Sequence, residues 1–355
     1  KAAVKMRKRI RDYGVVIGQH QPGPLNKLAD VPGVLVGHAT VDTKEHKTGV
    51  TVILPSQDNL FANKLTAAAY VHNGFGKTTG VLQIEELGTL ETPIALTNTL
   101  NVGLVQDALV DYMLKRCRED QISVSSVNAV VGECNDSYLN NIRDRVLGKE
   151  HVFEAITSAC TDFEEGDVGA GKGTSCFGMK GGIGSASRVL KIGGADFVIG
   201  VLVQSNFGST ENFILNGAMV GRELEKKISE RQKDEGSIMM VVGTNLPVSD
   251  RQLKRLIRRA GVGLSRCGSY MGHGSGDIML GFSTANRFYY KETNPFFQTR
   301  MLREEELDPA FEAAAEATEE AILNSLSMAH TLTVYHGRTR DSLADLYLAD
   351  WEEGR

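Results

Sequence analysis

Short apolar runs rich in β-branched residues recur along the chain, and glycines punctuate them. Runs of this length with β-branched side chains predict buried strands. Clear examples are residues 34–36, 50–54, 197–203, 238–242 and 278–282. We therefore expect strands along most of the chain.

Helical patterns lie between these runs. Residues 101–118 have apolar positions at helical spacing. Residues 249–259 open with a capping box, because Gln252 follows Ser249 by three positions. A third helix is predicted to begin at Asp308. Pro309 fits its first turn, because a backbone N–H at that position would have no partner within the helix. Strands and helices do not alternate regularly, so the pattern favours a layered α+β fold over a strict βαβ one.

Two segments interrupt this pattern. Residues 222–236 are dense in charge, and we expect either an exposed helix or a loop there. Residues 291–306 are mixed in character and precede the helix expected at Asp308. We interpret both segments as insertions or linkers.

Composition excludes several classes of protein. The 355 residues are 41% hydrophobic and 23% charged, which is ordinary for a globular protein. A net charge of -5 argues against a nucleic-acid surface, and no apolar run approaches the roughly 20 residues of a membrane span. The five cysteines form no CxxC pair, so we expect reduced thiols and a cytoplasmic location, or a periplasmic one if a leader has been removed. The histidines show no metal-ligand spacing, and we expect no metal and no cofactor.

The glycine-rich stretch 166–174 resembles part of a phosphate-binding loop. Gly166, Gly171 and Lys172 match that pattern, but Gly173 stands where a Ser or Thr would reach magnesium. We therefore interpret the stretch as turns and close packing near a site. Nucleotide binding without catalysis stays an alternative that rests on this imperfect loop alone.

A second glycine-rich segment, MGHGSGD at 271–277, directly precedes the predicted strand 278–282. A serine flanked by glycines at the head of a strand is either a tight turn or an exposed nucleophile. The glycine offsets differ from those of the G-x-S-x-G elbow, and we expect His273 to be a loop residue. A serine nucleophile without a histidine needs another base, and a freed α-amine with a pKa of about 7.7–8.0 can serve. That amine exists at Ser275 only if the bond from Gly274 is broken.

Eight blocks in one order carry a family resemblance: residues 28–38, 73–80, 93–99, 131–140, 203–208, 274–277, 282–286 and 317–324. With them the chain resembles the L-aminopeptidase D-amidase/D-esterase family, which includes the β-peptidyl aminopeptidases. The resemblance implies a four-layer αββα sandwich similar to amino-terminal nucleophile hydrolases but with its own strand connectivity. It implies a single domain, 1–355, that cuts itself between Gly274 and Ser275 into an α chain of 1–274 and a β chain of 275–355. It also implies homotetramers of αβ units that release N-terminal L-α, β or D residues from short peptides, amides or esters.

The resemblance gives roles to individual positions. It makes Ser275 the nucleophile, and it makes the Asn206 side chain and the Asn135 backbone N–H the oxyanion hole. Glu133 matches the carboxylate that holds the free amine of the substrate. Lys77 stands where we expect an acidic residue, so the rim at 73–80 is expected to favour different substrates.

Thr318 and Glu320 match a hydroxyl and a carboxylate that assist the nucleophile in this family. Thr318 shares a helical stripe with Phe311, Ala315 and Ile322, which puts its hydroxyl on the buried face. A threonine there also commonly bonds its own helix carbonyl. Glu320 lies about 200° further around a regular helix, so only one of the pair can face the nucleophile unless the helix distorts.

An acyltransferase on the same fold is the alternative function. Such an enzyme would resemble the self-cleaving ornithine acetyltransferases, which are expected to use threonine as the nucleophile. The serine at position 275 therefore favours hydrolysis. The expected partner is a small peptide, amide or ester substrate, with no nucleic-acid or membrane partner.

Overall fold

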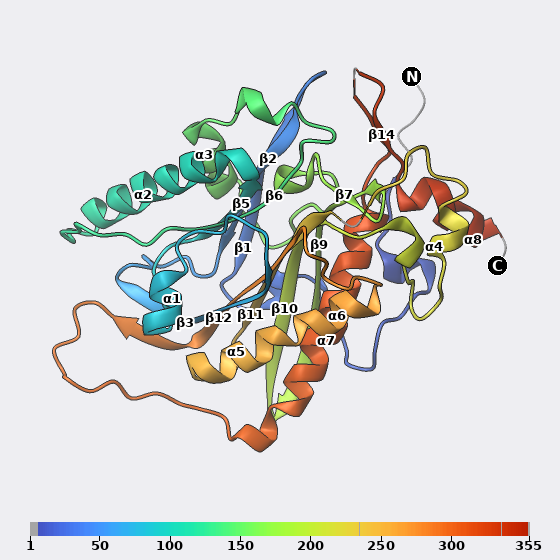
Figure 1. Ribbon diagram of the computed structural model, residues 1–355. Coiled ribbons are helices and arrows are strands. Elements are labelled where there is room, and N and C mark those ends of the chain that lie inside the picture. Colours follow the sequence, from blue (N-terminus) through green and yellow to red (C-terminus); the bar gives the residue numbers. More distant parts are fainter. Residues whose placement is uncertain (1–5, 234, 335, 354–355) are drawn as a thin grey trace.

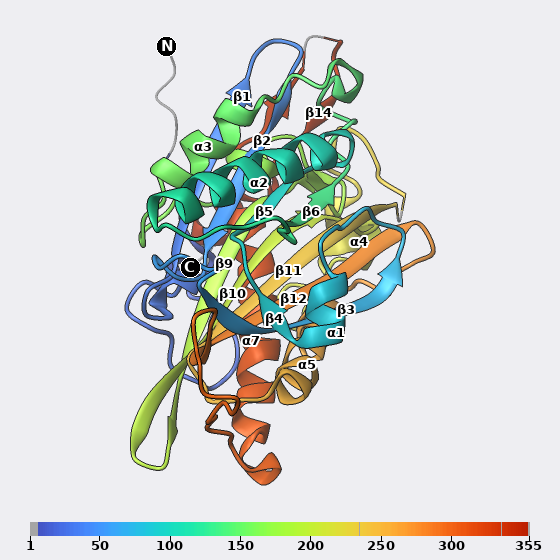
Figure 2. The same cartoon turned by 90° about the vertical axis from the view of Figure 1, so that its left-hand side faces the viewer.

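The computed structural model describes residues 6–233, 235–334 and 336–353. Two β-sheets pack face to face, and helices cover the outer face of each (Figures 1 and 2). The expected α+β class and its four αββα layers are thus confirmed.

Within the described residues, the smaller sheet has four strands in the order β1-β2-β5-β6. They are β1 (Leu35–Asp42), β2 (Lys47–Leu54), β5 (Ile94–Asn98) and β6 (Val130–Cys134). The larger sheet of the described chain has six strands in the order β4-β3-β12-β11-β10-β9. They are β3 (Asn63–Gly74), β4 (Thr89–Leu90), β9 (Gly182–Ile192), β10 (Ala195–Asn206), β11 (Gly236–Thr244) and β12 (Ser275–Tyr289). Short strands β7 (Ser175–Cys176), β8 (Met179–Lys180), β13 (Leu332–Thr333) and β14 (Thr339–Arg340) form two hairpins outside these sheets.

The strand directions bring several strand ends together. β5 and β6 run parallel, and so do β11 and β12, whereas the other neighbours are antiparallel. Gly236 pairs with Ser275, so β11 and β12 begin side by side. Because β10 runs the opposite way, its last residue, Asn206, pairs with Ser237 at the same edge. This edge of the larger sheet carries the site described below.

The helices form the outer layers. α2 (Val102–Glu119) and α3 (Lys149–Thr157) cover the smaller sheet, while α5 (Asp250–Arg258), α6 (Ala260–Arg266) and α7 (Asp308–Ser327) cover the larger one (Figure 1). The shorter helices are α1 (Leu82–Leu87), α4 (Gly221–Leu224) and α8 (Ala349–Glu353). The predicted capping box is confirmed, since Ser249 and Gln252 each accept a hydrogen bond from the other's backbone N–H. None of the described helices combines the length and apolar character that a bilayer crossing requires.

Apolar side chains fill the spaces between the layers. Ile53, Leu96, Val241 and Phe282 belong to the core between the sheets, and each is fully buried. Burial of one such side chain stabilises the fold by about 1.5–3 kcal/mol. The packed layers therefore provide a rigid support for the strand ends.

The strands extend beyond the apolar runs that predicted them. The run 278–282 lies inside β12, which continues from Ser275 to Tyr289. The apolar run 34–36 starts one residue before its strand, because β1 begins at Leu35 and not at Val34. In the charged segment 222–236, α4 ends at Leu224 and irregular backbone then leads to β11. Residue 234 of this segment lies outside the described residues.

Candidate active site

A cavity of about 780 Å³ opens at the edge where β10 ends and β11 and β12 begin. Four residues expected at the site line it: Glu133, Asn135, Asn206 and Gly274. They come from β6, from the segment that follows it, from β10 and from the turn before β12. The fold therefore gathers residues that lie far apart in the sequence around one space.

Ser275 heads β12 next to this cavity and is only 2% exposed. Its hydroxyl donates a hydrogen bond of 2.9 Å to Oδ1 of Asp277. Side chains two positions apart on a strand point to the same side, so the strand geometry itself produces this pair. The Ser275 N–H donates to the carbonyl of Gly272 at 3.0 Å, which closes the turn that contains His273, as expected for a loop residue.

Asn73 of β3 holds this turn from the neighbouring strand. It pairs with Asp277 in the sheet, and its Nδ2 donates to the carbonyls of Gly272 at 2.9 Å and His273 at 3.1 Å. Nδ2 also lies within hydrogen-bond distance of the Ser275 carbonyl. One side chain thus fixes the backbone on both sides of the Gly274–Ser275 bond.

The two glycines beside Ser275 differ in their packing. A Cβ at Gly276 would lie 2.8 Å from the carbonyl oxygen of Phe75, so close backbone approach requires glycine there. A Cβ at Gly274 would meet only the Glu235 side chain, at 3.9 Å, which is an ordinary contact. Packing therefore requires glycine at position 276 but not at position 274.

Glu133 is 3% exposed and lines the cavity from β6. Its Oε1 accepts a hydrogen bond of 3.0 Å from the backbone N–H of Lys77, and its Oε2 accepts one from the Thr99 hydroxyl. The Lys77 ammonium lies 4.8 Å from the ring centre of Phe75. Two donors therefore orient the carboxylate, whose remaining lone pairs can accept from a cation in the cavity.

Asn206 ends β10 and is buried. Its Oδ1 accepts a hydrogen bond of 2.9 Å from the Ser175 N–H, which fixes the orientation of the amide and leaves Nδ2 as a donor. Asn135 directly follows β6, and its Oδ1 accepts from the Ser137 N–H at 3.0 Å in an Asx-type turn. That turn fixes the backbone of Asn135 at the wall of the cavity.

Thr318 and Glu320 lie elsewhere, on α7. Thr318 is fully buried, and its hydroxyl donates to the Ala314 carbonyl at 2.7 Å, the more ordinary role for a helical threonine. Glu320 is fully buried on another face, where it forms ion pairs of 2.9 Å with both Arg188 and Arg11. Neither residue lines the cavity. These contacts give Thr318 and Glu320, both on α7, other partners, and their expected assistance to Ser275 stays a prediction.

The glycine-rich stretch 166–174 packs around a buried lysine. The Lys180 ammonium donates to the carbonyls of Gly171, Thr174 and Gly181 at 2.9, 2.7 and 2.8 Å, and burial lowers the pKa of Lys180 to about 7. These carbonyl oxygens would repel a phosphate, so the nucleotide alternative is not supported. Lys180 does not line the cavity, whereas Tyr138 does.

Among the residues to which sequence reasoning gave no role are Ser175, Arg338 and Arg340, all of which line the cavity. Nε of Arg340 donates to the Ser175 hydroxyl at 3.0 Å, and its guanidinium lies 3.6 Å from the ring centre of Tyr138. No local motif marks these positions in the sequence.

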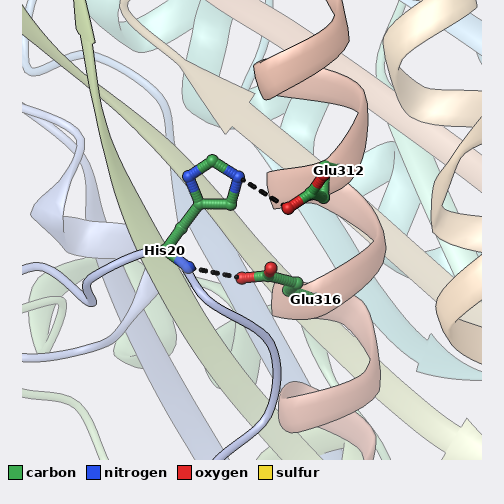
Figure 3. Close-up of side chains that lie close together, drawn as sticks. All are labelled: His20, Glu312 and Glu316. Carbon is green, nitrogen blue, oxygen red and sulfur yellow. Dashed lines mark hydrogen bonds and ion pairs between the residues drawn. The ribbon is translucent and has the colours of Figure 1, made fainter.

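A histidine and two glutamates meet outside the cavity (Figure 3). The His20 ring lies 3.2 Å from Glu312, and its backbone N–H donates to Oε2 of Glu316. The same Oε2 accepts from Nε of Arg188 at 3.1 Å. Because a guanidinium already neutralises this carboxylate, the cluster is a poor site for a cation. An exposed group of Glu45, His46 and Asp144 is held by a contact of 2.7 Å from His46 to Asp144.

The layered α+β fold is that of a variant of the amino-terminal nucleophile hydrolases, with Ser275 at the head of a central strand. The chain belongs to peptidase family S58, whose model matches residues 26–340, and it is a hydrolase of the aminopeptidase type. It is 37% identical to the β-peptidyl aminopeptidase of Sphingosinicella microcystinivorans over 93% of this chain and 88% of that protein. A crystal structure of a Pyrococcus horikoshii protein matches with 44% identity and a TM-score of 0.92, covering 98% of this chain and 100% of the other.

A third comparison bears on the fold. The L-aminopeptidase D-Ala-esterase/amidase of Ochrobactrum anthropi, described as a prototype of the serine aminopeptidases and a variant of the amino-terminal nucleophile hydrolase fold, matches with a TM-score of 0.90 and 32% identity. The match covers 98% of this chain and 99% of that one. The fold class is therefore shared with solved aminopeptidases.

Proposed function

We infer that the protein is a self-processing serine aminopeptidase that uses Ser275 as its N-terminal nucleophile. One observation carries the proposal: Glu133, Asn135, Asn206 and Gly274, the residue directly before Ser275, line a single cavity. An amine-binding carboxylate, two oxyanion donors and a serine hydroxyl are the groups that such a reaction requires.

Self-cleavage creates the nucleophile. The Ser275 hydroxyl attacks the carbonyl carbon of Gly274 and gives up its proton toward Asp277, whose Oδ1 already accepts its hydrogen bond. The C–N bond then breaks, which leaves Gly274 joined to Ser275 through an ester and the Ser275 nitrogen protonated as an amine. Water hydrolyses the ester, so that Gly274 ends in a carboxylate and Ser275 begins the new chain.

Turnover uses the freed amine. Glu133 holds the ammonium of the substrate, which places the first peptide bond next to Ser275. The α-amine takes the hydroxyl proton as Oγ attacks the scissile carbonyl. Nδ2 of Asn206 and the N–H of Asn135 stabilise the oxyanion, and each donor of this kind contributes roughly 3–4 kcal/mol. The leaving amine takes the proton, and water then releases the acyl group from Ser275.

The amine requirement defines the substrates as short peptides, amides or esters with a free N-terminus. The buried carboxylate of Glu133 is a specific acceptor for that ammonium, and a blocked amine would leave the carboxylate without a cation. The accepted N-terminal residues are of the L-α, β or D class, and the names of the relatives support the β class in particular.

Hydrolysis of amino-acid p-nitroanilides tests this proposal. We expect the wild-type protein to hydrolyse at least one of the L-α, β and D compounds and to leave their N-acetyl derivatives intact. Ser275→Ala should abolish hydrolysis. Ser283→Ala serves as the matched control on the same strand, because the Ser283 hydroxyl donates to the Leu246 carbonyl at 2.6 Å, away from the cavity. A Ser275→Ala protein with wild-type activity would reject the proposal.

A further inference from the structure

Positively charged residues outnumber negatively charged ones in the lining of the cavity. The charged residues that line the cavity are Lys77, Glu133, Arg231, Lys233, Glu235, Arg338 and Arg340. Glu133 serves the substrate amine in the proposed function, but nothing in that chemistry uses the cations. Arg231 forms an ion pair of 3.1 Å with Glu225, which neutralises part of the positive charge. The arginines of the β13–β14 hairpin have no such partner among the described residues.

Arg340 is the most buried of these cations. It ends β14 and lines the cavity, yet it is only 3% exposed. Nε donates to the Ser175 hydroxyl and Nη1 to the Glu230 carbonyl, each at 3.0 Å. A guanidinium has five N–H donors, so further donors can serve a ligand. In the described part of the chain no carboxylate forms an ion pair with Arg340, and the more distant charges of Glu230 and Asp341 only partly offset the cost of burying its guanidinium.

The contacts of Arg340 connect it to the expected oxyanion hole. Ser175 joins it to the expected oxyanion hole, because its N–H donates to Asn206 while its hydroxyl accepts from Arg340. On the other side the guanidinium stacks 3.6 Å from the ring centre of Tyr138. Arg338 lies 5.3 Å from the same ring centre. The guanidinium of Arg340 is therefore held on two sides, within the wall that a substrate at Ser275 would face.

We propose that Arg340, assisted by Arg338, binds a carboxylate on the leaving-group side of the substrate. The inference deepens the proposed function and rests on it. The planar guanidinium fork matches a carboxylate, and such charged hydrogen bonds are among the strong ones. A short peptide with free termini would then meet Glu133 at its ammonium and Arg340 at its carboxylate. The enzyme should accordingly favour dipeptides over the same dipeptides with an amidated C-terminus.

A comparison of matched substrates with the wild-type protein tests this directly. With the N-terminal residue that gives the fastest p-nitroanilide hydrolysis, we expect kcat/KM for X-Gly to exceed that for X-glycinamide by about 10- to 100-fold. A second pair, X-Glu and X-Gln with the C-terminus of both amidated, shows whether a side-chain carboxylate also serves. Equal rates for acids and neutral amides in both pairs would overturn the inference. Continued p-nitroanilide hydrolysis in that case would leave the proposed function intact, whereas its absence would reject that function itself.

Variants then assign the preference to a residue. The ratio of kcat/KM for X-Gly over X-glycinamide should fall toward one in Arg340→Gln, and this ratio cancels any general loss of catalysis. Arg222→Gln, at an exposed arginine of α4 outside the cavity, should keep the wild-type ratio. A wild-type ratio in Arg340→Gln would contradict the role of Arg340. If Arg340→Gln does not fold, Arg338→Gln, at an exposed position, should still lower the ratio. An unchanged ratio in Arg338→Gln would then contradict the proposed carboxylate site.

Discussion

The hydroxyl of Ser275 donates a hydrogen bond of 2.9 Å to the carboxylate of Asp277, and both residues are buried on the same side of β12. Before cleavage the nitrogen of Ser275 is an amide and cannot act as a base. Asp277 is the carboxylate in contact with the hydroxyl at that stage. We therefore expect Asp277 to be the general base during cleavage and the freed α-amine to be the general base during turnover.

Replacement of Asp277 tests whether it is the general base for cleavage. In Asp277→Asn we expect cleavage at Ser275 to slow by about 100-fold, because general-base assistance typically contributes 10²–10⁴-fold. The measurement is a time course of the intact and cleaved bands on a denaturing gel after the precursor is synthesised. Cleavage at the wild-type rate would show that Asp277 is not the base.

Glu133→Gln should separate amine binding from catalysis. The substitution keeps the shape of the side chain but removes the charge that faces the ammonium of the substrate. We expect kcat/KM to fall by about 10- to 100-fold, mainly through KM, since a hydrogen bond to a charged group contributes about 1.5–3 kcal/mol. Steady-state kinetics on a p-nitroanilide measure both constants. An unchanged KM would remove Glu133 from the amine site.

If Glu320 acts only through its ion pairs, Glu320→Gln should lower stability and leave turnover unchanged. Glu320 forms buried ion pairs with Arg188 and Arg11, and removal of one partner of such a pair costs about 3–5 kcal/mol. Urea unfolding in a Ser275→Ala background, which keeps the chain intact, measures the free energy of unfolding. The kcat of the cleaved Glu320→Gln enzyme is measured in parallel. A large fall in kcat without a loss of stability would instead support the expected catalytic role of Glu320.

His38 should make the fold sensitive to acid. Its Nε2 donates to the Glu164 carbonyl at 2.8 Å and its Nδ1 contacts the Thr51 hydroxyl at 2.9 Å, and burial lowers the pKa of His38 from 6.5 to about 4. Because the folded pKa lies below the unfolded one, this stability is complete above pH 6.5 and is lost as pH falls through 4. The loss at pH 4 amounts to roughly 3 kcal/mol.

Substitution by a side chain that does not titrate tests the role of His38. The slope of unfolding free energy against pH between 6.5 and 4 should flatten in His38→Gln, and urea unfolding at several pH values measures it. An identical slope in the variant would assign the acid sensitivity to other groups. His46, which is paired with the exposed Asp144, offers a surface control in His46→Gln.

The sequence predicted the residues whose signals are local. Ser275 stands between glycines before an apolar run, and Glu133 and Asn206 fall in family blocks near strand ends. Strand centres were predicted because apolar runs mark them, while backbone pairing carries β12 on through polar residues to Tyr289. The helical period also indicated that Glu320 could not share a face with Thr318.

Other parts of the site have no local signal. Asn73, Ser175 and Arg340 reach the site from segments that only the sheet topology and a distant hairpin bring together. An isolated asparagine, serine or arginine in a polar stretch carries no spacing that would set it apart. Their roles depend on tertiary contacts, and these become visible only in the folded chain.

The N-terminal sequence of the smaller fragment of active protein tests the central claim most directly. The account predicts a cut before Ser275, so that this fragment begins Ser-Gly-Asp-Ile and covers residues 275–355. Ser275→Ala should give only the intact chain of 355 residues. Fully active protein that remains a single chain, or a fragment that begins at any other residue, would contradict Ser275 as the N-terminal nucleophile.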